Sequence, residues 1–389
     1  MERLLLKNVL HDGRVRNILI EDNRFKDLDA PAEVAEAKVQ DASGTAILPA
    51  LYNTHTHAAM TLLRGYADDM PLQTWLRDYI WPFEDKLTPE DIRHGSEIAA
   101  DEMIRSGTVF FNDMYFDVEE TIDVVNRTGM RAAIGITVMD NHSKAVTREK
   151  REFIRHWQDP TGGRIRLLVA PHSIYTVGDK KLRDCAAYAR EHGLLLHIHL
   201  SETKKEVADC MREHGTTPVK YLDSIGFLGP DVIAAHCVHV DDEEADILAE
   251  RGVTISHCPC SNMKLGSGVF PYSRLMKAGC RITLGTDGAS SGNNLDLREA
   301  MKFAALLAKS GGDPELLPAE EIFRWATRSG AEAFGIDAGV IAEGKLADCL
   351  LIDLSDIRMQ PCHHLVSNLV YSADSRCIKH VLCDGRIIL

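Results

Sequence analysis

The chain has 389 residues, of which 45% are hydrophobic and 26% charged, so it has an ordinary globular composition and is long enough to bury a large core. Its formal net charge of −14, with no basic cluster interleaved with aromatics, argues against nucleic acid as a partner. The opening three-leucine run is too short for a signal peptide, and no stretch approaches the roughly 18 apolar residues of a membrane span. We therefore expect a cytoplasmic protein without a membrane partner, and ten cysteines without small-domain spacing fit free thiols in a reducing compartment.

Both terminal regions of the sequence are expected to form strands. Residues 1–28, 344–354 and 378–389 contain short apolar runs with turn signals and no helical pattern between them. We expect them to pair into a small β-sandwich made of residues 1–48 and 340–389, beside a catalytic part of residues 49–339. Two unrelated flexible tails are the weaker alternative, because both regions are rich in Leu, Ile and Val.

The apolar run AILPALYNTHTH, residues 46–57, ends abruptly in two histidines. Side chains two positions apart on a strand point to the same side, so His55 and His57 would project together from its end. An isolated pair of this kind is more often solvated or hydrogen-bonded than metal-binding. Its meaning therefore depends on what else lies near it.

After His57 the sequence repeats one pattern of a short apolar run, a polar or glycine-containing loop and an amphipathic helical stretch. Eight alternations of strand and helix predict a (β/α)8 barrel. The helical stretches include residues 180–192, 207–214, 241–251 and 272–278. The eight strand-like runs are residues 46–57, 108–114, 131–138, 165–175, 194–202, 232–239, 253–262 and 281–290.

Polar residues gather at the C-terminal end of these runs, which is the face of a (β/α)8 barrel that carries active sites. A ring of histidines with two carboxylates at a barrel mouth is far more often a site than a set of satisfied core residues. This convergence changes the interpretation of the first histidine pair. The residues concerned are His55, His57, His172, His199, Glu202, His236, His257 and Asp287.

Four of these residues form a candidate metal site: His55, His57, His199 and Asp287. Mixed nitrogen and oxygen ligands suit Zn²⁺ or Fe²⁺ better than Ca²⁺ or Mg²⁺, and such an ion makes bound water acidic near neutral pH.

Glu202 follows the ligand candidate His199 at the end of its run, where it could carry a proton from water to a ring nitrogen. The plainer interpretation is a glutamate favoured at a helix N-terminus. His236 could orient the attacking oxygen, and His197, two residues deeper, is expected to serve packing.

Five motifs in this order resemble the amidohydrolase superfamily, and within it the 5-methylthioadenosine/S-adenosylhomocysteine deaminases and related purine deaminases. The resemblance implies that His55, His57, His199 and Asp287 hold the metal. It also implies that Glu202 shuttles protons and that His236 polarises the attacking oxygen. No lysine stands in APHSIY, where binuclear members carry a carbamylated one, so one divalent ion per chain is implied, Zn²⁺ first and Fe²⁺ as the alternative. The motifs are NTHTH, HIHLSE, AAHCVH, SHCPCSNMKLGSG and LGTDGAS.

The same resemblance implies the substrate contacts. The segment PLQTWLRDYIWPFE, residues 71–84, would supply Trp75 to pack on the substrate and Glu84 to bind the ribose hydroxyls, and His172 would meet a purine ring nitrogen. Without the resemblance, Trp75 and Glu84 could equally belong to an amphipathic helix with one buried face. Aligned by eye, Arg148 matches one of two arginines that grip the homocysteine carboxylate, and Ile136 occupies the other position.

The sequence thus predicts a hydrolytic deaminase that converts the 6-amino group of an adenine nucleoside to the inosine analogue and ammonia. The candidate substrates are adenosine, 5′-methylthioadenosine and, less favoured, S-adenosylhomocysteine. The nearest alternative is an amidohydrolase for another amino-heterocycle, such as guanine, a pterin or an s-triazine, and a non-catalytic scaffold barrel is a weaker one. Homo-oligomer formation stays open.

Overall fold

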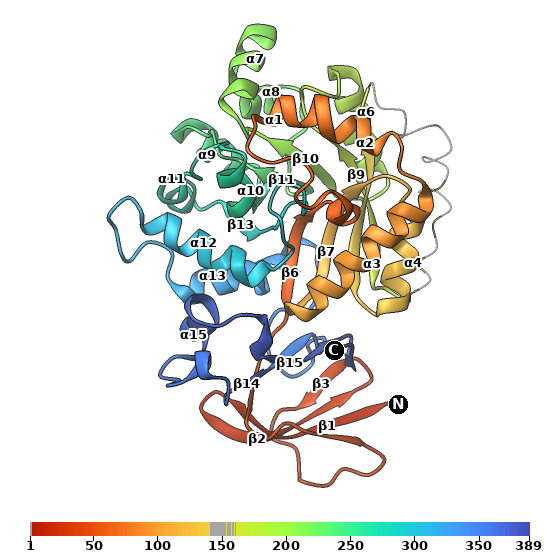
Figure 1. The fold of residues 1–389 in the computed structure, drawn as a ribbon, viewed down its shortest axis with the longest axis vertical. Helices are drawn as coiled ribbons and strands as arrows, with labels where there is room; N and C mark the ends of the chain where they lie inside the picture. The colour runs from red at the N-terminus through yellow and green to blue at the C-terminus, as the bar shows by residue number, and fades with distance from the viewer. Residues whose placement is uncertain (1, 141–152, 154–156, 158, 160) are drawn as a thin grey trace.

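The computed structural model describes residues 2–140, 153, 157, 159 and 161–389. It consists of a parallel barrel and a separate sheet, which appear one above the other in Figure 1. The predicted fold class is confirmed. Among the described residues, no helix combines the length and the apolar character needed to cross a membrane.

The barrel sheet runs in strand order β13-β12-β11-β10-β9-β8-β7-β6, and all neighbouring pairs are parallel. Side-chain and backbone hydrogen bonds join its first and last strands, because Thr54 Oγ1 lies 2.8 Å from Thr283 Oγ1 and Asp287 N donates to His55 O at 3.0 Å. The strands are β6 Leu51–Thr56, β7 Thr108–Tyr115, β8 Arg131–Val138, β9 Ile165–Pro171, β10 Leu196–Leu200, β11 Val232–His236, β12 Thr254–His257 and β13 Arg281–Leu284.

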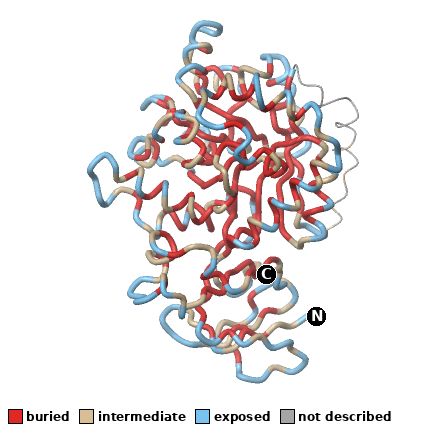
Figure 2. The backbone as a smooth tube through the Cα atoms, in the orientation of Figure 1, coloured by how far each residue is buried: buried red, intermediate tan, exposed pale blue. Residues whose placement is uncertain are grey.

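Helices cover the outside of the barrel, and the buried residues concentrate on the strands between them (Figure 2). The apolar faces of α3 and α4 bury residues such as Ala99, Met103 and Val125 against the strands. The helices around the barrel are α3 Pro89–Arg105, α4 Val118–Thr128, α6 Asp179–Glu191, α7 Lys204–His214, α8 Pro218–Ser224, α9 Asp242–Glu250, α10 Pro259–Lys264, α11 Tyr272–Lys277, α12 Leu297–Lys309, α13 Ala319–Ala326 and α14 Arg328–Ala333.

The second sheet combines strands from both terminal regions of the sequence, in the order β16-β15-β14-β5-β1-β2-β3, with β4 paired to β1. The predicted domain limits after residue 48 and before residue 340 stay a prediction. The strands are β1 Arg3–His11, β2 Arg14–Glu21, β3 Arg24–Asp27, β4 Lys38–Asp41, β5 Thr45–Pro49, β14 Cys349–Asp353, β15 Ile378–Cys383 and β16 Arg386–Ile387; η3 Ile357–Met359, α15 Leu365–Tyr371 and η4 Ser375–Cys377 lie between β14 and β15.

One predicted strand is in fact two. The run at residues 46–57 divides at Ala50 into β5, which pairs with β14 in the second sheet, and β6, which enters the barrel. Continuous hydrophobicity hides this division because both strands are buried. A connection of one residue, Ala50, therefore joins the two sheets, and His55 follows five positions later on β6.

A buried ion-pair network also joins the two sheets. Arg131 on β8 donates to both carboxylate oxygens of Asp348, at 2.8 and 3.3 Å, and to Asp384 at 2.5 Å. Asp348 also accepts the Tyr52 hydroxyl at 2.5 Å. The Asp348 side chain is fully buried, so Arg131 compensates a carboxylate that has no access to solvent.

Candidate active site

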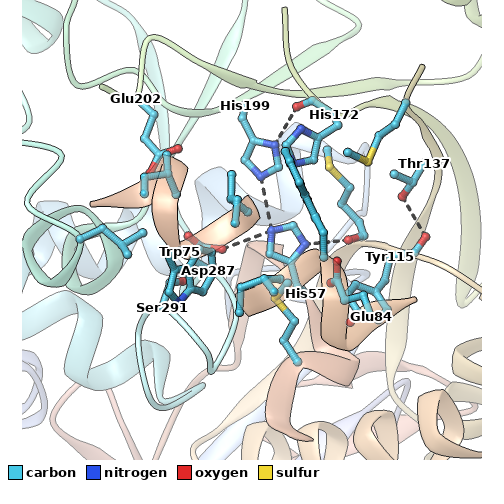
Figure 3. Close-up of a pocket in the computed structure, with 18 of the residues that line it drawn as sticks. His57, Trp75, Glu84, Tyr115, Thr137, His172, His199, Glu202, Asp287 and Ser291 are labelled. Carbon is cyan, nitrogen blue, oxygen red and sulfur yellow. Dashed lines mark hydrogen bonds and ion pairs between the residues drawn. The ribbon is translucent and has the colours of Figure 1, made fainter. Parts of the chain in front are cut away.

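The site lies at the barrel end toward which the strands run. There a pocket is lined by the side chains of His57, His172, His199, Glu202, His236 and Asp287 (Figure 3). His55 is fully buried beneath them, and its ring lies 4.9 Å from those of His57 and His199 between centroids. The structure thus brings together all the residues that the sequence analysis selected for metal binding and proton transfer.

The hydrogen bonds of His57 and His199 define which ring nitrogen is available to a metal. His57 Nδ1 donates to Met114 O at 2.6 Å, and His199 Nδ1 donates to His172 O at 2.7 Å. Because a carbonyl oxygen can only accept, the proton lies on Nδ1 in both rings and Nε2 carries a lone pair. The two Nε2 atoms are 3.3 Å apart, close enough for one ion to contact both.

A chain of two hydrogen bonds determines which nitrogen of the His55 ring carries the proton. His197 Nδ1 donates to Ile233 O at 3.0 Å, which leaves His197 Nε2 as an acceptor. It accepts from His55 Nδ1 at 2.8 Å, so His55 Nε2 also carries a lone pair. His197 was expected to serve packing alone, and this contact was missed; its position two residues before His199, on the same side of the strand, was the available signal.

Asp287, the fourth ligand candidate, lies close to the ring nitrogens of the histidines that carry no proton. Asp287 Oδ1 lies 3.3 Å from His57 Nε2 and 3.5 Å from His55 Nε2. Within the described part of the chain His55 Nε2 has no hydrogen-bond partner, although it is buried. The ligand atoms of His55, His57 and His199 all lie within 4.8 Å of one another. Three bare imidazole nitrogens facing a carboxylate fit a cation such as Zn²⁺ or Fe²⁺.

The electrostatics of the buried histidines agree with this donor set. Burial lowers the pKa of His55 to about 4, and burial with the neighbouring histidines holds the pKa of His199 well below its ordinary value. Both rings are therefore neutral near pH 7, which is the form that binds a metal.

Residues of α10 and of the connection after it, which the sequence analysis did not select, orient the remaining polar groups. Ser261 Oγ donates to Asp287 Oδ2 at 2.6 Å, and Asn262 Oδ1 accepts from His236 Nδ1 at 2.8 Å. Ser267 Oγ donates to Glu202 Oε1 at 3.1 Å. Ser261 and Asn262 belong to α10 and Ser267 to the connection between α10 and α11, so the segment SHCPCSNMKLGSG contributes supports rather than ligands.

Glu202 and His236 lie beside the ligand histidines, and the His236 ring stacks on that of His199 with centroids 5.5 Å apart. His236 Nε2 is 3.9 Å from both Glu202 Oε2 and Asp287 Oδ2. Burial raises the pKa of Glu202; burial lowers the pKa of His236, but the carboxylates of Glu202 and Asp287 outweigh this and raise it above its ordinary value. A carboxyl group and an imidazole this close can pass a proton between them.

A second glutamate holds the backbone from which Glu202 projects. Glu206 Oε1 accepts from Ser201 N and Oε2 accepts from Glu202 N, both at 2.8 Å. Ser201 has a left-handed backbone with φ of 50°, which few residues other than glycine adopt. The Glu206 carboxylate therefore stabilises a turn that would otherwise be unfavourable, and sequence reasoning missed it.

The outer wall of the pocket contains the predicted substrate contacts. Trp75, Glu84 and His172 all line it (Figure 3), and Trp75 Nε1 donates to Ala67 O at 3.0 Å. Tyr115 lines the pocket near Glu84 (Figure 3), and burial together with the Glu84 carboxylate raises the pKa of Tyr115 well above its ordinary value.

Two residues of the carboxylate-binding prediction need separate comment. Ile136 does not line the pocket: it packs with Ile134 in the apolar layer between β8 and the helices α3 and α4. The expectation that it replaces a ligand-binding arginine is wrong, because alternation turns Thr137 inward and Ile136 outward. Arg148 lies outside the described residues.

The fold and the polar cluster define a (β/α)8 hydrolase with a metal-ligand set at the mouth of its barrel. A family model described as the amidohydrolase family matches residues 46–388, and the chain belongs to this family.

Three comparisons refine the assignment. The chain is 46% identical to a 5′-deoxyadenosine deaminase of Methanothermobacter thermautotrophicus, covering 98% of this chain and 91% of that one. It is 43% identical to a 5-methylthioadenosine/S-adenosylhomocysteine deaminase of Haloarcula marismortui, covering 93% and 85%. A crystal structure of an adenosine deaminase from Xanthomonas campestris with bound zinc has a TM-score of 0.92 and 33% identity, covering 99% of this chain and 92% of that one.

Proposed function

We propose that the protein is a metal-dependent deaminase that converts the 6-amino group of an adenine nucleoside to the inosine analogue with release of ammonia. The observation that carries the proposal is the single pocket that combines the histidine and aspartate cluster with Trp75 and Glu84 on its other wall. The relatives named as deaminases of 5′-deoxyadenosine and of 5-methylthioadenosine support the same substrate class.

His55, His57, His199 and Asp287 hold one divalent ion in this proposal, with Zn²⁺ ahead of Fe²⁺. His55 Nε2 has no hydrogen-bond partner among the described residues, and the Nε2 atoms of His57 and His199 are only 3.3 Å apart; both observations support that ligand set. A bound ion supplies Lewis acidity, which makes a water molecule nucleophilic near neutral pH.

Glu202 and His236 carry out the proton chemistry. Glu202 takes a proton from the attacking water and delivers it to the ring nitrogen next to C6, which removes the aromatic stabilisation of the purine there. His236, held by Asn262, directs its Nε2 toward the attacking oxygen. The second proton of the attacking water, now on the C6 hydroxyl, then passes through Glu202 to the amino group; the C6–N bond breaks, ammonia leaves and the C6 oxygen becomes the carbonyl of the inosine analogue.

The outer pocket binds the nucleoside. Trp75 packs against it, His172 meets a ring nitrogen, and Glu84 accepts hydrogen bonds from the ribose hydroxyls. Among the described residues that line the pocket there is no arginine or lysine, so none of these residues supplies a cation for an amino-acid carboxylate. We therefore expect adenosine, 5′-deoxyadenosine or 5′-methylthioadenosine to be better substrates than S-adenosylhomocysteine, and Arg148 stays a predicted contact.

The test is a comparison of ammonia release by zinc-loaded protein with five substrates: adenosine, 5′-methylthioadenosine, S-adenosylhomocysteine, adenine and guanine. We expect nucleosides to exceed adenine by about 10- to 100-fold in kcat/KM, because the hydrogen bonds between the ribose hydroxyls and the buried Glu84 carboxylate are lost when the ribose is absent. Guanine or adenine as the best substrate would contradict the proposal. Metal analysis should give one ion per chain, reduced in an Asp287→Ala variant.

A further inference from the structure

One helical segment forms much of the outer wall of the pocket. It runs from α1 Leu72–Trp75 through the π-helical turn η2 Leu76–Ile80 to α2 Trp81–Glu84, and lies across the upper end of the barrel in Figure 1. Its backbone stays right-handed and helical through both junctions. The segment contributes six residues to the pocket wall: Leu72, Trp75, Leu76, Ile80, Trp81 and Glu84.

The spacing of Trp75 and Glu84 does not suit an uninterrupted α-helix. The two residues are nine positions apart (84 − 75), and about 100° per residue gives about 900°, or roughly two and a half turns. In a regular α-helix they would lie on opposite sides. Both are nevertheless directed into the same pocket, with only 5% and 3% of their surfaces exposed.

The π turn accounts for the difference. Its i→i+5 hydrogen bonding takes one residue more than an α turn. Arg77, Asp78 and Tyr79 are exposed in succession, and Ile80 is buried again, as expected where a turn has absorbed an additional residue. With one residue absorbed, Trp75 and Glu84 are separated by eight α-helical steps, about 800°, and lie within about 80° of each other.

We propose that the π turn Leu76–Ile80 is the element that determines nucleoside specificity, because it turns Glu84 to the side of the helix on which Trp75 lies. The inference rests on the proposed function, in which Trp75 packs on the nucleoside and Glu84 binds its ribose. Glu84 is the specificity residue that contacts the ligand, and the π turn acts by positioning it. In a regular α-helix, the side chain of Tyr79 would occupy the pocket side instead.

The proposal predicts an asymmetric response to length changes at one exposed position. Deletion of Asp78 removes the additional residue, lets the segment become a regular α-helix and keeps Trp75 and Glu84 on one side. Insertion of one alanine after Asp78 adds a second additional residue and turns Glu84 away by about 100°. If the π turn had no such role, the deletion and the insertion would rotate Glu84 relative to Trp75 by equal angles in opposite directions. Both variants would then lose the preference for nucleosides.

The measurement is the ratio of kcat/KM for adenosine to that for adenine, in zinc-loaded protein with confirmed metal content. We expect the deletion of Asp78 to keep this ratio within about threefold of the parent and the insertion to lower it about 10- to 100-fold. Equal loss in both variants, or equal retention, would overturn the proposal.

A second measurement does not depend on the substrate. Glu84→Cys is placed in the deletion and insertion variants, in a background with Cys362→Ser because Cys362 is the exposed native thiol among the described cysteines. The labelling rate of the new thiol should stay slow in the deletion variant and rise at least about tenfold in the insertion variant, where position 84 faces solvent. Equal labelling rates in the deletion and insertion variants would overturn the assignment of position 84 to the side of the helix on which Trp75 lies. A Glu84→Ala variant that keeps the adenosine preference would instead contradict the ribose contact, and labelling alone would then decide the role of the π turn.

Discussion

Replacement of His197 by leucine should weaken metal binding although His197 is not a ligand. Leucine removes the only acceptor that the described structure offers to His55 Nδ1, which His197 Nε2 contacts at 2.8 Å in a fully buried position. The loss of an outer hydrogen-bond partner typically lowers metal affinity about 10- to 100-fold. An unsatisfied buried N–H costs about 1 to 3 kcal/mol, which is close to the free energy that corresponds to a 10- to 100-fold loss of affinity.

The assay is a competition titration of the metal-free protein with zinc and a chelator of known affinity, alongside thermal unfolding of the metal-free protein. His197→Gln serves as a rescue variant, because its side-chain carbonyl can accept from His55. His257→Phe is the matched control: His257 is equally buried at the barrel end, but its ring contacts Tyr272 OH at 2.8 Å and does not line the pocket. Zinc affinity of His197→Leu within about twofold of the parent would refute the reasoning.

Three further predictions concern other residues. Glu202→Gln should retain metal but lower kcat about 10² to 10⁴-fold, and a metal-loaded variant with nearly full turnover would disprove its role. Glu206→Gln should lower kcat with little change in KM. Burial raises the Glu206 pKa from 4.5 to about 7, so the folded state binds more protons than the unfolded state between these pH values. Its stability therefore falls as pH rises through that window, by up to roughly 3 kcal/mol. Urea unfolding at pH 5 and 7.5 should give a smaller difference in unfolding free energy for the variant than for the parent, and an equal difference would contradict this. Arg131→Met should cost about 3 to 5 kcal/mol of unfolding free energy because Asp348 is left buried and unpaired, whereas Arg105→Met, at an exposed pair, should cost under about 1 kcal/mol; similar urea midpoints for both would be the contrary result.

The barrel was predictable because its strands are continuous apolar runs that end in polar residues. In β7, for example, every residue is buried, and only burial on both faces of a sheet produces such a run. The ligand candidates were predictable for the same reason, since parallel strands bring their C-terminal ends to one mouth. His55 and His57 needed only the two-residue period of the strand.

The features that escaped prediction depend on register or on loop geometry. Ile136 was misplaced because a shift of one residue reverses the side that a strand residue faces, and the apolar run of β8 is buried on both faces, so it contains no alternation that would fix the side. The supports Ser261 and Glu206 act through hydrogen bonds to residues whose neighbourhood exists only after folding. The π turn changes the helical period within one turn, which no periodic pattern can indicate.

The connection between β5 and β6 has a consequence for how the protein folds. β5 pairs with β14, about 300 residues later in the sequence, and β6 follows after a single residue and carries His55. Contacts over such separations are entropically costly to form early and slow the folding of a domain. We expect β6 to stay unanchored at its start until β14 is available, so that assembly of the metal ligands is a late event in folding and coincides with completion of the second sheet.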